Sequence, residues 1–330
     1  MDKRKIKNSD LFITPVAFGA WAIGGFMWGG AERSDALEAI NTAIDNGMTT
    51  IDTAPVYGMG ASELLVGEAI KGKRDQVEIL TKCGLRWDEK EREFFFSTDD
   101  PRGKSIDIYK NGTKKSIIRE CEDSLRRLGT DYIDLYQLHW PTPSDPIEET
   151  MEAFNVLIKQ GKIRYAAVCN FDAEQLSEAM QFTPLISDQV PYSMVKRDIE
   201  DDVVPFCRAN ELGIFAYSPM QRGLLTGKFS PDHEFSKGDS RADAPHFKPE
   251  NIKKTNAFLD EIKEIAKSKN ITLAQLVLRW TMVQPGISCV LAGARNAEQV
   301  AENIGAANFN LEKDEIETIN SKLDNLSLDL

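Results

Sequence analysis

Long apolar runs are missing from this sequence of 330 residues. No window approaches the run of about 18 apolar residues that a membrane-spanning helix needs. The charged residues 1–5 (MDKRK) are not followed by the apolar stretch of a secretory signal. The sequence therefore predicts neither a membrane span nor a signal peptide.

Cysteine is scarce, and no CxxC pair is present. The five cysteines are odd in number and widely spaced: Cys83, Cys121, Cys169, Cys207 and Cys289. This usage is typical of reduced thiols, so we expect a cytoplasmic protein.

Basic residues are fewer than acidic ones, and the formal charge is −12 at pH 7. This charge argues against nucleic acid or an anionic membrane as the main partner. It is compatible with an anionic cofactor, since a local group of basic side chains can hold phosphates inside an acidic protein.

What the sequence does contain is a regular alternation of strand-like and helix-like segments. A hairpin is expected over residues 3–13, and a last helix over residues 312–323. Between them we expect strands at residues 16–21, 48–54, 77–82, 133–139, 163–169, 185–190, 213–218 and 288–293. The helices that follow them are expected at residues 34–46, 62–71, 114–128, 147–160, 173–182, 201–212, 252–282 and 297–304.

Several local signals support these boundaries. Ser34 is a plausible N-cap of its helix, and Gly47 lies just past the end of the same helix. The segment 252–282 is expected to break into two helices near Asn270. No linker or low-complexity tract interrupts the pattern.

Eight strand–helix repeats predict an α/β fold in which a parallel sheet closes into a single (β/α)8 TIM barrel. This one domain would span residues 1–330, with an N-terminal β-hairpin and extra C-terminal helices. A dinucleotide-binding Rossmann domain needs G-x-G-x-x-G after the first strand, whereas residues 19–25 (GAWAIGG) have another spacing.

Ionisable residues stand where three predicted strands end: Asp52, Lys82 and His139. Tyr57 lies in the loop beyond the first of them. Chemistry in such barrels sits at the carboxyl ends of the strands, so we expect these four side chains to meet at one rim. Each could alternatively be a structural polar group, but the coincidence of all four favours an acid–base cluster.

Tyr57 is the predicted proton donor. A phenol has a pKa of about 10, and a nearby Lys82 ammonium would lower it by roughly a unit. Asp52 would keep the lysine charged and in position, and His139 would orient the carbonyl oxygen that receives the proton.

Two long stretches, residues 85–112 and 229–250, are expected to be irregular and to serve as lids or substrate walls because both follow strands. The first is rich in aromatic residues. An apolar wall, or alternatively a subunit interface, is predicted from Trp21, Phe26, Trp28, Trp87, Phe94, Phe95, Phe96, Tyr109 and Trp140.

The chain resembles the aldo-keto reductases over nearly its whole length. The resemblance rests on residues 47–54 (GMTTIDTA) with Tyr57 and Gly58, on residues 125–135 (LRRLGTDYIDL), on residues 161–164 (GKIR) leading to Asn170, and on residues 217–228 (YSPMQRGLLTGK). The pattern is most similar to the branch of bacterial reductases and potassium channel beta subunits. That family's catalytic tetrad matches Asp52, Tyr57, Lys82 and His139.

The resemblance implies a nicotinamide cofactor. Asn170 and Gln189 would clamp its carboxamide, Tyr217 would stack on its ring, and Arg295 would bind the 2′-phosphate, so NADPH is favoured. The implied cofactor-binding residues are Trp21, Asp52, Asn170, Gln189, Tyr217, Ser218, Pro219, Met220, Arg222, Leu224, Gly227, Lys228, Gly293, Arg295, Gln299, Glu302 and Asn303. The implied substrate-binding residues are Trp21, Tyr57, Trp87, His139 and Trp140.

Two positions depart from the family pattern. Cys169 replaces a frequent serine, which could make the site sensitive to oxidation, and Gln299 replaces a frequent arginine, which would make selectivity against NADH modest. We expect an NADPH-dependent enzyme that reduces aldehydes or ketones, or that catalyses the reverse reaction, the oxidation of a sugar or alcohol. The alternatives are an NADP-binding redox sensor with slow turnover and a metal-dependent hydrolase; the latter is disfavoured because only His139 of three histidines ends a strand.

Overall fold

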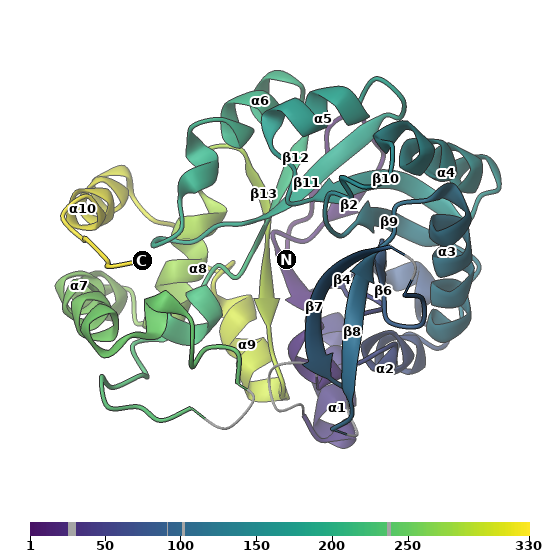
Figure 1. Cartoon of the computed structure of the whole chain (residues 1–330). Helices are drawn as coiled ribbons and strands as arrows, with labels where there is room; N and C mark the ends of the chain where they lie inside the picture. Colours follow the sequence, from purple (N-terminus) through teal and green to yellow (C-terminus); the bar gives the residue numbers. More distant parts are fainter. Residues whose placement is uncertain (26–30, 91, 101–102, 236–238) are drawn as a thin grey trace.

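The computed structural model describes residues 1–25, 31–90, 92–100, 103–235 and 239–330. Its centre is a closed barrel of parallel strands (Figure 1). Around the barrel the order is β3 (Val16–Gly19), β4 (Thr50–Asp52), β5 (Glu78–Cys83), β9 (Ile133–Leu138), β10 (Ile163–Cys169), β11 (Leu185–Pro191), β12 (Gly213–Tyr217) and β13 (Ile287–Gly293). The predicted (β/α)8 barrel is confirmed.

Helices surround this barrel and follow its strands in turn. They are α1 (Arg33–Asp45), α2 (Ala61–Ala69), α3 (Lys114–Leu128), α4 (Ile147–Lys159), α5 (Ala173–Ala179), α6 (Val203–Ala209), α8 (Leu273–Met282) and α9 (Ala297–Gly305). Two further helices, α7 (Pro249–Ser268) and α10 (Lys313–Leu323), pack together outside this ring (Figure 1). The break predicted near Asn270 separates α7 from α8, and Asn270 has a φ of 54°.

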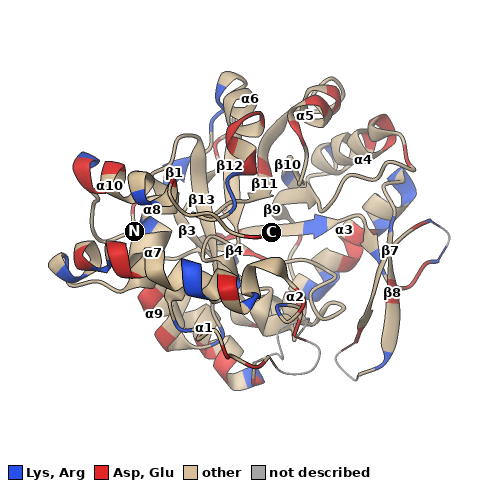
Figure 2. Ribbon diagram, turned by 60° about the vertical axis from the view of Figure 1, so that its left-hand side comes forward, with Lys and Arg blue, Asp and Glu red and all other residues tan. Residues whose placement is uncertain are grey.

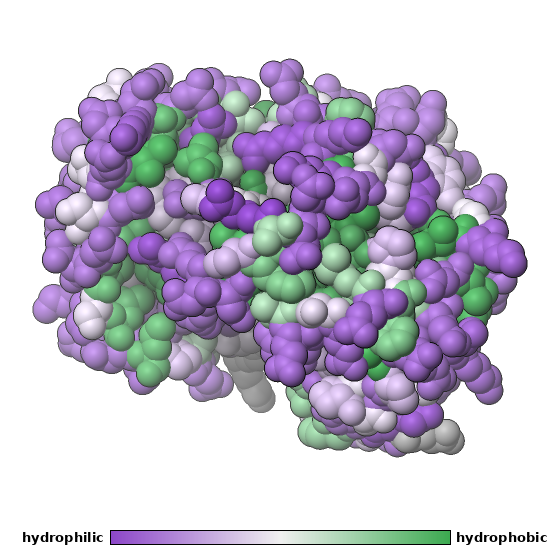
Figure 3. All heavy atoms as spheres, turned by 90° about the horizontal axis from the view of Figure 1, so that it is seen from above, coloured by the Kyte–Doolittle hydropathy of each residue, from purple (hydrophilic) through white to green (hydrophobic). Residues whose placement is uncertain are grey.

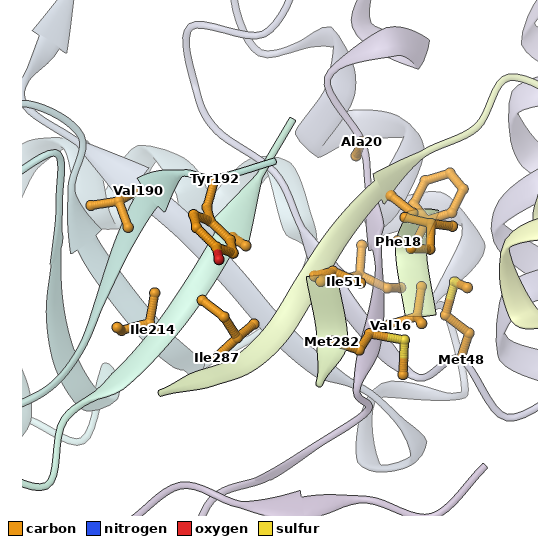
Figure 4. Packing of buried hydrophobic residues seen from close by; sticks show 14 of the residues in the cluster. Val16, Phe18, Ala20, Met48, Ile51, Val190, Tyr192, Ile214, Met282 and Ile287 are labelled. Carbon is orange, nitrogen blue, oxygen red and sulfur yellow. The ribbon is translucent and has the colours of Figure 1, made fainter. Parts of the chain in front are cut away.

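The barrel wall buries two apolar layers, because alternate residues of a strand face opposite sides. Val16 and Phe18 of β3 belong to the layer between strands and helices, where Met48 and Met282 also lie (Figure 4). Ala17, between them in sequence, belongs to the layer inside the barrel.

The N-terminal hairpin closes one end of the barrel. It consists of β1 (Arg4–Lys5) and β2 (Phe12–Ile13), which pair antiparallel. Ile6, Leu11 and Ile13 are buried in the same cluster as the barrel's interior side chains. A ligand therefore has access only at the carboxyl ends of the strands, the usual site of chemistry in this architecture.

Two local predictions were wrong. Helix α1 begins at Arg33 with Glu32 as its N-cap, so Ser34 lies inside the first turn. Residues 85–112 are not irregular, because β6 (Leu85–Arg86), β8 (Ser105–Lys110) and β7 (Glu93–Asp99) form an antiparallel sheet in that order. Phe26 and Trp28, predicted in the apolar wall, lie outside the described residues.

Charged residues of both signs are spread over the outer helices, as α7 and α10 illustrate (Figure 2). Hydrophilic residues predominate on the face seen in Figure 3, and hydrophobic ones form small separate groups there. Among the described residues, no helix is long and apolar enough to cross a membrane.

Candidate active site

The Lys82 ammonium is the centre of a buried polar cluster at the open rim of the barrel. Its Nζ donates to Asp52 Oδ2 at 2.6 Å, to the Thr53 carbonyl oxygen at 2.9 Å and to Tyr57 Oη at 3.3 Å. An ammonium has three protons, so these three acceptors satisfy it completely. The Lys82 side chain is 0% exposed, and a charge at such a depth persists only when it is paired and hydrogen-bonded.

The second oxygen of Asp52 is held by two amides. Oδ1 accepts from Gln189 Nε2 at 2.8 Å and from Gln137 Nε2 at 3.3 Å. Gln137 pairs directly with Lys82 across β5 and β9, which explains how it reaches the same carboxylate. Hydrogen bonds therefore hold both oxygens of the Asp52 carboxylate, and the fixed carboxylate in turn holds the Lys82 ammonium in place.

Tyr57 is positioned by a close approach of two loops. Gly58 has a φ of 66°, and a Cβ there would lie 1.9 Å from the carbonyl oxygen of Gly24. A Cβ on Gly24 would in turn lie 2.9 Å from the Tyr57 carbonyl oxygen. Both positions thus require glycine, and the contact between them holds the loop that carries the phenol.

Aromatic contacts place Tyr57 beside the histidine of the cluster. Its ring stacks on Trp21 with centroids 5.9 Å apart and meets the His139 ring edge-on at 5.8 Å. The backbone N–H of His139 donates to the Cys83 carbonyl oxygen at 2.9 Å, which extends the β5–β9 pairing by one residue. The structure therefore brings together all four residues predicted to meet at the rim.

The pKa of Tyr57 is changed more by burial than by the nearby lysine. Burial raises the pKa of Tyr57 to about 12, although the Lys82 ammonium acts to lower it. The expectation of a net lowered pKa was therefore wrong, because it took the charge into account without the loss of solvent.

The other two ionisable groups are shifted in ways that fix their charge near neutrality. Burial disfavours the Lys82 ammonium, but the Asp52 carboxylate and the Tyr57 phenol together raise its pKa above the ordinary value. Burial and then the charge of Lys82 hold the pKa of His139 well below its usual range. The imidazole is thus neutral at pH 7 and keeps one N–H donor and one acceptor.

A cavity of about 510 Å³ runs from this cluster to the amino end of α9. Its volume lies within the range of about 300–1,000 Å³ that small-molecule sites occupy. The predicted cofactor residues that line it are Trp21, Asp52, Asn170, Gln189, Tyr217, Ser218, Pro219, Met220, Arg222, Lys228, Gly293, Arg295, Gln299, Glu302 and Asn303. Trp140, predicted to bind substrate, also lines the cavity. Five predicted residues are not among its lining residues: Leu224 and Gly227 of the cofactor set, Trp87 of the substrate set, and Phe94 and Tyr109 of the apolar wall.

At the catalytic end, Tyr217 and Asn170 form a linked pair. The Tyr217 hydroxyl donates to Asn170 Oδ1 at 2.9 Å, and Asn170 Nδ2 donates to the His139 carbonyl oxygen at 3.0 Å. Asn170 has a φ of 62°, an uncommon conformation for a residue other than glycine. Asn170 and Gln189 already bond within the protein, so a bound carboxamide would share or replace those bonds.

The segment after β12 also has an unusual backbone. Ser218, Gln221 and Arg222 have φ values of 53°, 45° and 55°, and Gly223 follows with 93°. Non-glycine residues in this region are strained, and such strain is concentrated at functional sites. Ser218, Arg222 and Gly223 all line the cavity.

The far end of the cavity is suited to an anion. Asn296 caps α9 by accepting from the backbone N–H of Gln299 at 3.0 Å, and the Arg295 N–H donates to Gln299 Oε1 at 2.9 Å. The Arg295 side chain is exposed and, among the described residues, has no ion pair. A guanidinium beside a helix amino end is a favourable phosphate environment.

Sequence reasoning missed Arg241 in this cavity. Its guanidinium forms a bidentate pair with Asp239, with Nη2 at 2.6 Å from Oδ2 and Nε at 2.9 Å from Oδ1. Its Nη1 also donates to the Arg222 carbonyl oxygen at 3.4 Å, which ties residues 239–241 to the segment after β12. Its one signal in the sequence was its position within residues 229–250, a stretch already expected to face the site.

The residues present fit a nicotinamide dinucleotide. Aromatic and amide side chains lie beside the acid–base cluster, strained backbone follows β12, and Arg295 lies at a helix amino end. Within the described part of the chain, no group of three or more His, Cys, Asp or Glu side chains is arranged to hold a metal ion.

Comparison with known proteins gives consistent matches. The sequence model of the Aldo/keto reductase family matches residues 15–324. The NADH-specific methylglyoxal reductase of Escherichia coli is 37% identical over 317 residues, which cover 94% of this chain and 95% of that protein.

Two solved structures are also similar. The glycerol dehydrogenase of Gluconobacter oxydans has a TM-score of 0.88 and 34% identity, with 98% of this chain and 96% of that chain covered. An aldo/keto reductase of Klebsiella pneumoniae, solved with NADP and acetate, has a TM-score of 0.72 and 29% identity, with 94% and 92% covered.

Proposed function

Because the chain belongs to the aldo/keto reductase family, we propose that it is an NADPH-dependent reductase of aldehydes and ketones with Tyr57 as the general acid. The observation that carries this proposal is the Lys82 ammonium, whose third hydrogen bond goes to Tyr57 Oη at 3.3 Å. The phenol borders a cavity that extends to the amino end of α9.

Each residue of the cluster has a separate task. Tyr217, Asn170 and Gln189 would hold a reduced nicotinamide, which when bound would provide the hydride that the substrate's carbonyl carbon receives. Tyr57 gives its proton to the carbonyl oxygen, and Lys82 stabilises the phenolate that remains. The neutral His139 imidazole donates a hydrogen bond to the same oxygen and so orients it.

The same groups support the reverse reaction. With Tyr57 deprotonated, its oxygen accepts the proton of an alcohol or sugar hydroxyl, and Lys82 stabilises the phenolate beforehand. With a pKa of about 12, the Tyr57 phenol is protonated at neutral pH, which is the state that carbonyl reduction requires.

Arg295 supports NADPH over NADH. Its guanidinium is exposed at the amino end of α9, where a 2′-phosphate would find both a charge and a helix dipole. The Escherichia coli relative is NADH-specific and the Klebsiella pneumoniae structure contains NADP, so preference within the family varies.

Turnover tests the catalytic assignment. Purified protein is mixed with NADPH and a panel of aldehydes and ketones, and loss of the reduced cofactor is followed by absorbance. We expect Tyr57→Phe to lose activity by roughly 10²–10⁴-fold. Tyr109→Phe, which removes a phenol from the outer face of the β7–β8 sheet, should retain it. Tight NADPH binding with no wild-type turnover above Tyr57→Phe would refute the enzymatic assignment.

Two cofactors and two variants test the phosphate assignment. Arg295→Ala should raise the KM for NADPH by roughly tenfold and leave that for NADH within about twofold, because only NADPH has the 2′-phosphate. Lys228, another basic residue that lines the cavity, follows the strained segment after β12, and we expect its charge to attract the pyrophosphate that NADPH and NADH share. Lys228→Ala should therefore weaken the binding of both cofactors in parallel. A parallel loss in Arg295→Ala would remove this role from the arginine.

A further inference from the structure

The catalytic end of the cavity has an apolar wall that the acid–base cluster does not explain. Phe95 and Phe96 of β7 line the cavity together with Tyr57 and His139. They belong to a hairpin, β7–β8, that lies outside the barrel sheet, at the side of the molecule (Figure 2). The described residues of this hairpin contribute no charged group to the cavity lining. Arg222, Lys228, Arg241, Arg295 and Glu302, which do line it, all follow β12 or β13.

An irregularity in strand pairing creates this wall. Phe94 lies opposite Tyr109 and Phe96 lies opposite Ile108, so Phe95 is an extra residue in β7. In a regular strand, neighbouring residues face opposite sides. The extra residue of a β-bulge breaks that rule, and here both Phe95 and Phe96 reach the cavity.

The two faces of the hairpin differ sharply in character. On the outer face, Phe94 is 55% exposed and meets the Tyr109 ring edge-on, while Ser97 Oγ donates to Asp107 Oδ1 at 2.7 Å. On the inner face, Ile108 is fully buried in a cluster that includes Tyr57 and Leu85. The outer face is therefore exposed to solvent, whereas the inner face is apolar and buried against the residues around Tyr57.

The wall is rigidly placed relative to the catalytic residues. The Phe95 ring lies 5.0 Å from Phe96 and 5.4 Å from Trp140, centroid to centroid. Lys110 Nζ lies 4.7 Å from the same ring and pairs with Glu93 at 3.4 Å. Trp140 directly follows His139, so these contacts fix the distance between the wall and the catalytic imidazole.

We infer that Phe95 and Phe96 determine substrate specificity, and that the site prefers aldehydes and ketones carrying an aromatic or branched apolar group over small polar carbonyl compounds. Trp21, Val56 and Leu85 supply further apolar lining at the same end. The apolar group lies against the wall while its carbonyl oxygen meets Tyr57 and His139. This inference rests on the proposed function, because it assumes that the carbonyl reacts at Tyr57.

Substrate pairs measured on matched variants test the inference. Steady-state kcat/KM with NADPH is determined for 4-nitrobenzaldehyde and for methylglyoxal on the wild type, Phe95→Ala, Phe96→Ala and Phe94→Ala. Loss of the wall should lower kcat/KM for the aromatic aldehyde roughly tenfold or more and leave that for methylglyoxal within about twofold. Phe94→Ala removes an equal ring from the outer face and should change neither value. Phe95→Leu should restore part of the preference.

A parallel loss for both aldehydes, or the same effect in Phe94→Ala, would overturn the inference while leaving the proposed reductase activity intact. Binding of benzyl alcohol in the presence of NADPH, where no reaction occurs, gives a second readout by calorimetry. If benzyl alcohol binds in a way that depends on Phe95 but the wild type reduces no aldehyde, the wall would be supported and the proposed function refuted. Circular dichroism melts of all variants establish that each is folded.

Discussion

Replacing Asp52 with asparagine should destabilise the protein strongly. The substitution keeps the size of the side chain but removes the carboxylate that pairs with Lys82, whose Nζ lies 2.6 Å from Oδ2. Because Oδ1 already accepts from Gln189 and Gln137, the new amide NH₂ would face the ammonium. A donor would then oppose a donor beside an ammonium whose side chain is fully buried.

The expected loss follows from the burial of the lysine. Leaving a buried charge without its partner costs about 3–5 kcal/mol. Lys82 would retain the Thr53 carbonyl and the Tyr57 hydroxyl, so we expect the lower end, about 3 kcal/mol, or roughly a hundredfold in the folding equilibrium. The exposed pair of Asp45 and Lys73, 3.3 Å apart, is a matched control: Asp45→Asn should cost about 0.5 kcal/mol or less.

The sign of the pH dependence separates this explanation from a simple packing defect. In the wild type the pKa of Lys82 is raised, so its contribution to stability is fully present below the unfolded pKa and is lost only at higher pH. In Asp52→Asn, burial without the carboxylate would lower that pKa below the unfolded value. The folded variant would then bind fewer protons than the unfolded chain, and its stability should rise with pH.

Urea unfolding followed by tryptophan fluorescence, at pH 7 and at pH 9.5, measures this difference. The difference in the free energy of unfolding between the wild type and Asp52→Asn, the stability gap, should be smaller at the higher pH. Adding Lys82→Met removes the unpaired cation and should recover most of the stability without recovering activity. A gap below about 1 kcal/mol at pH 7, or one that does not change with pH, would refute the reasoning.

Three further predictions concern other parts of the molecule. Burial raises the pKa of Glu120 to about 8, so its contribution is present below the unfolded pKa and is lost as pH rises toward 8. Glu120→Gln should therefore gain stability over the wild type, on the order of 2 kcal/mol at pH 8.5 but little at pH 4.5, and identical melting profiles would contradict this. Tyr217→Phe loses one hydrogen bond to Asn170 and should weaken cofactor binding about fivefold, whereas Tyr217→Leu should weaken it much more; equal effects would exclude stacking. Burial raises the pKa of the Cys169 thiol well above its usual value, so iodoacetamide should leave native activity unchanged, and rapid inactivation abolished by Cys169→Ser would show that the thiol is accessible.

The barrel and the catalytic cluster were predictable because both depend on short-range patterns. Alternating strand and helix segments indicate parallel strands, and parallel strands bring their carboxyl ends to one rim. Asp52, Lys82 and His139 could therefore be placed together from their positions at predicted strand ends alone. The hydrogen bonds of Lys82 to Asp52 and Tyr57, and the edge-on contact of Tyr57 with His139, match that placement.

Other features could not be predicted, for identifiable physical reasons. The β7 strand was mistaken for irregular structure because the extra residue Phe95 interrupts its period of two. The pKa of Tyr57 was misjudged because its direction depends on burial, which the sequence does not contain. The third acceptor of Lys82 is the Thr53 backbone carbonyl, which no residue type reveals.

The chemical step itself gives the most direct test of the central claim, that Tyr57 delivers a proton while Lys82 stabilises its phenolate. Single-turnover oxidation of pre-bound NADPH by an excess of aldehyde is measured on the wild type and on Tyr57→Phe, together with the cofactor Kd of each. We predict that Tyr57→Phe lowers the single-turnover rate by roughly 10²–10⁴-fold and leaves the Kd within about threefold. An unchanged rate, or a rate that falls only as far as cofactor binding weakens, would contradict the role assigned to the phenol.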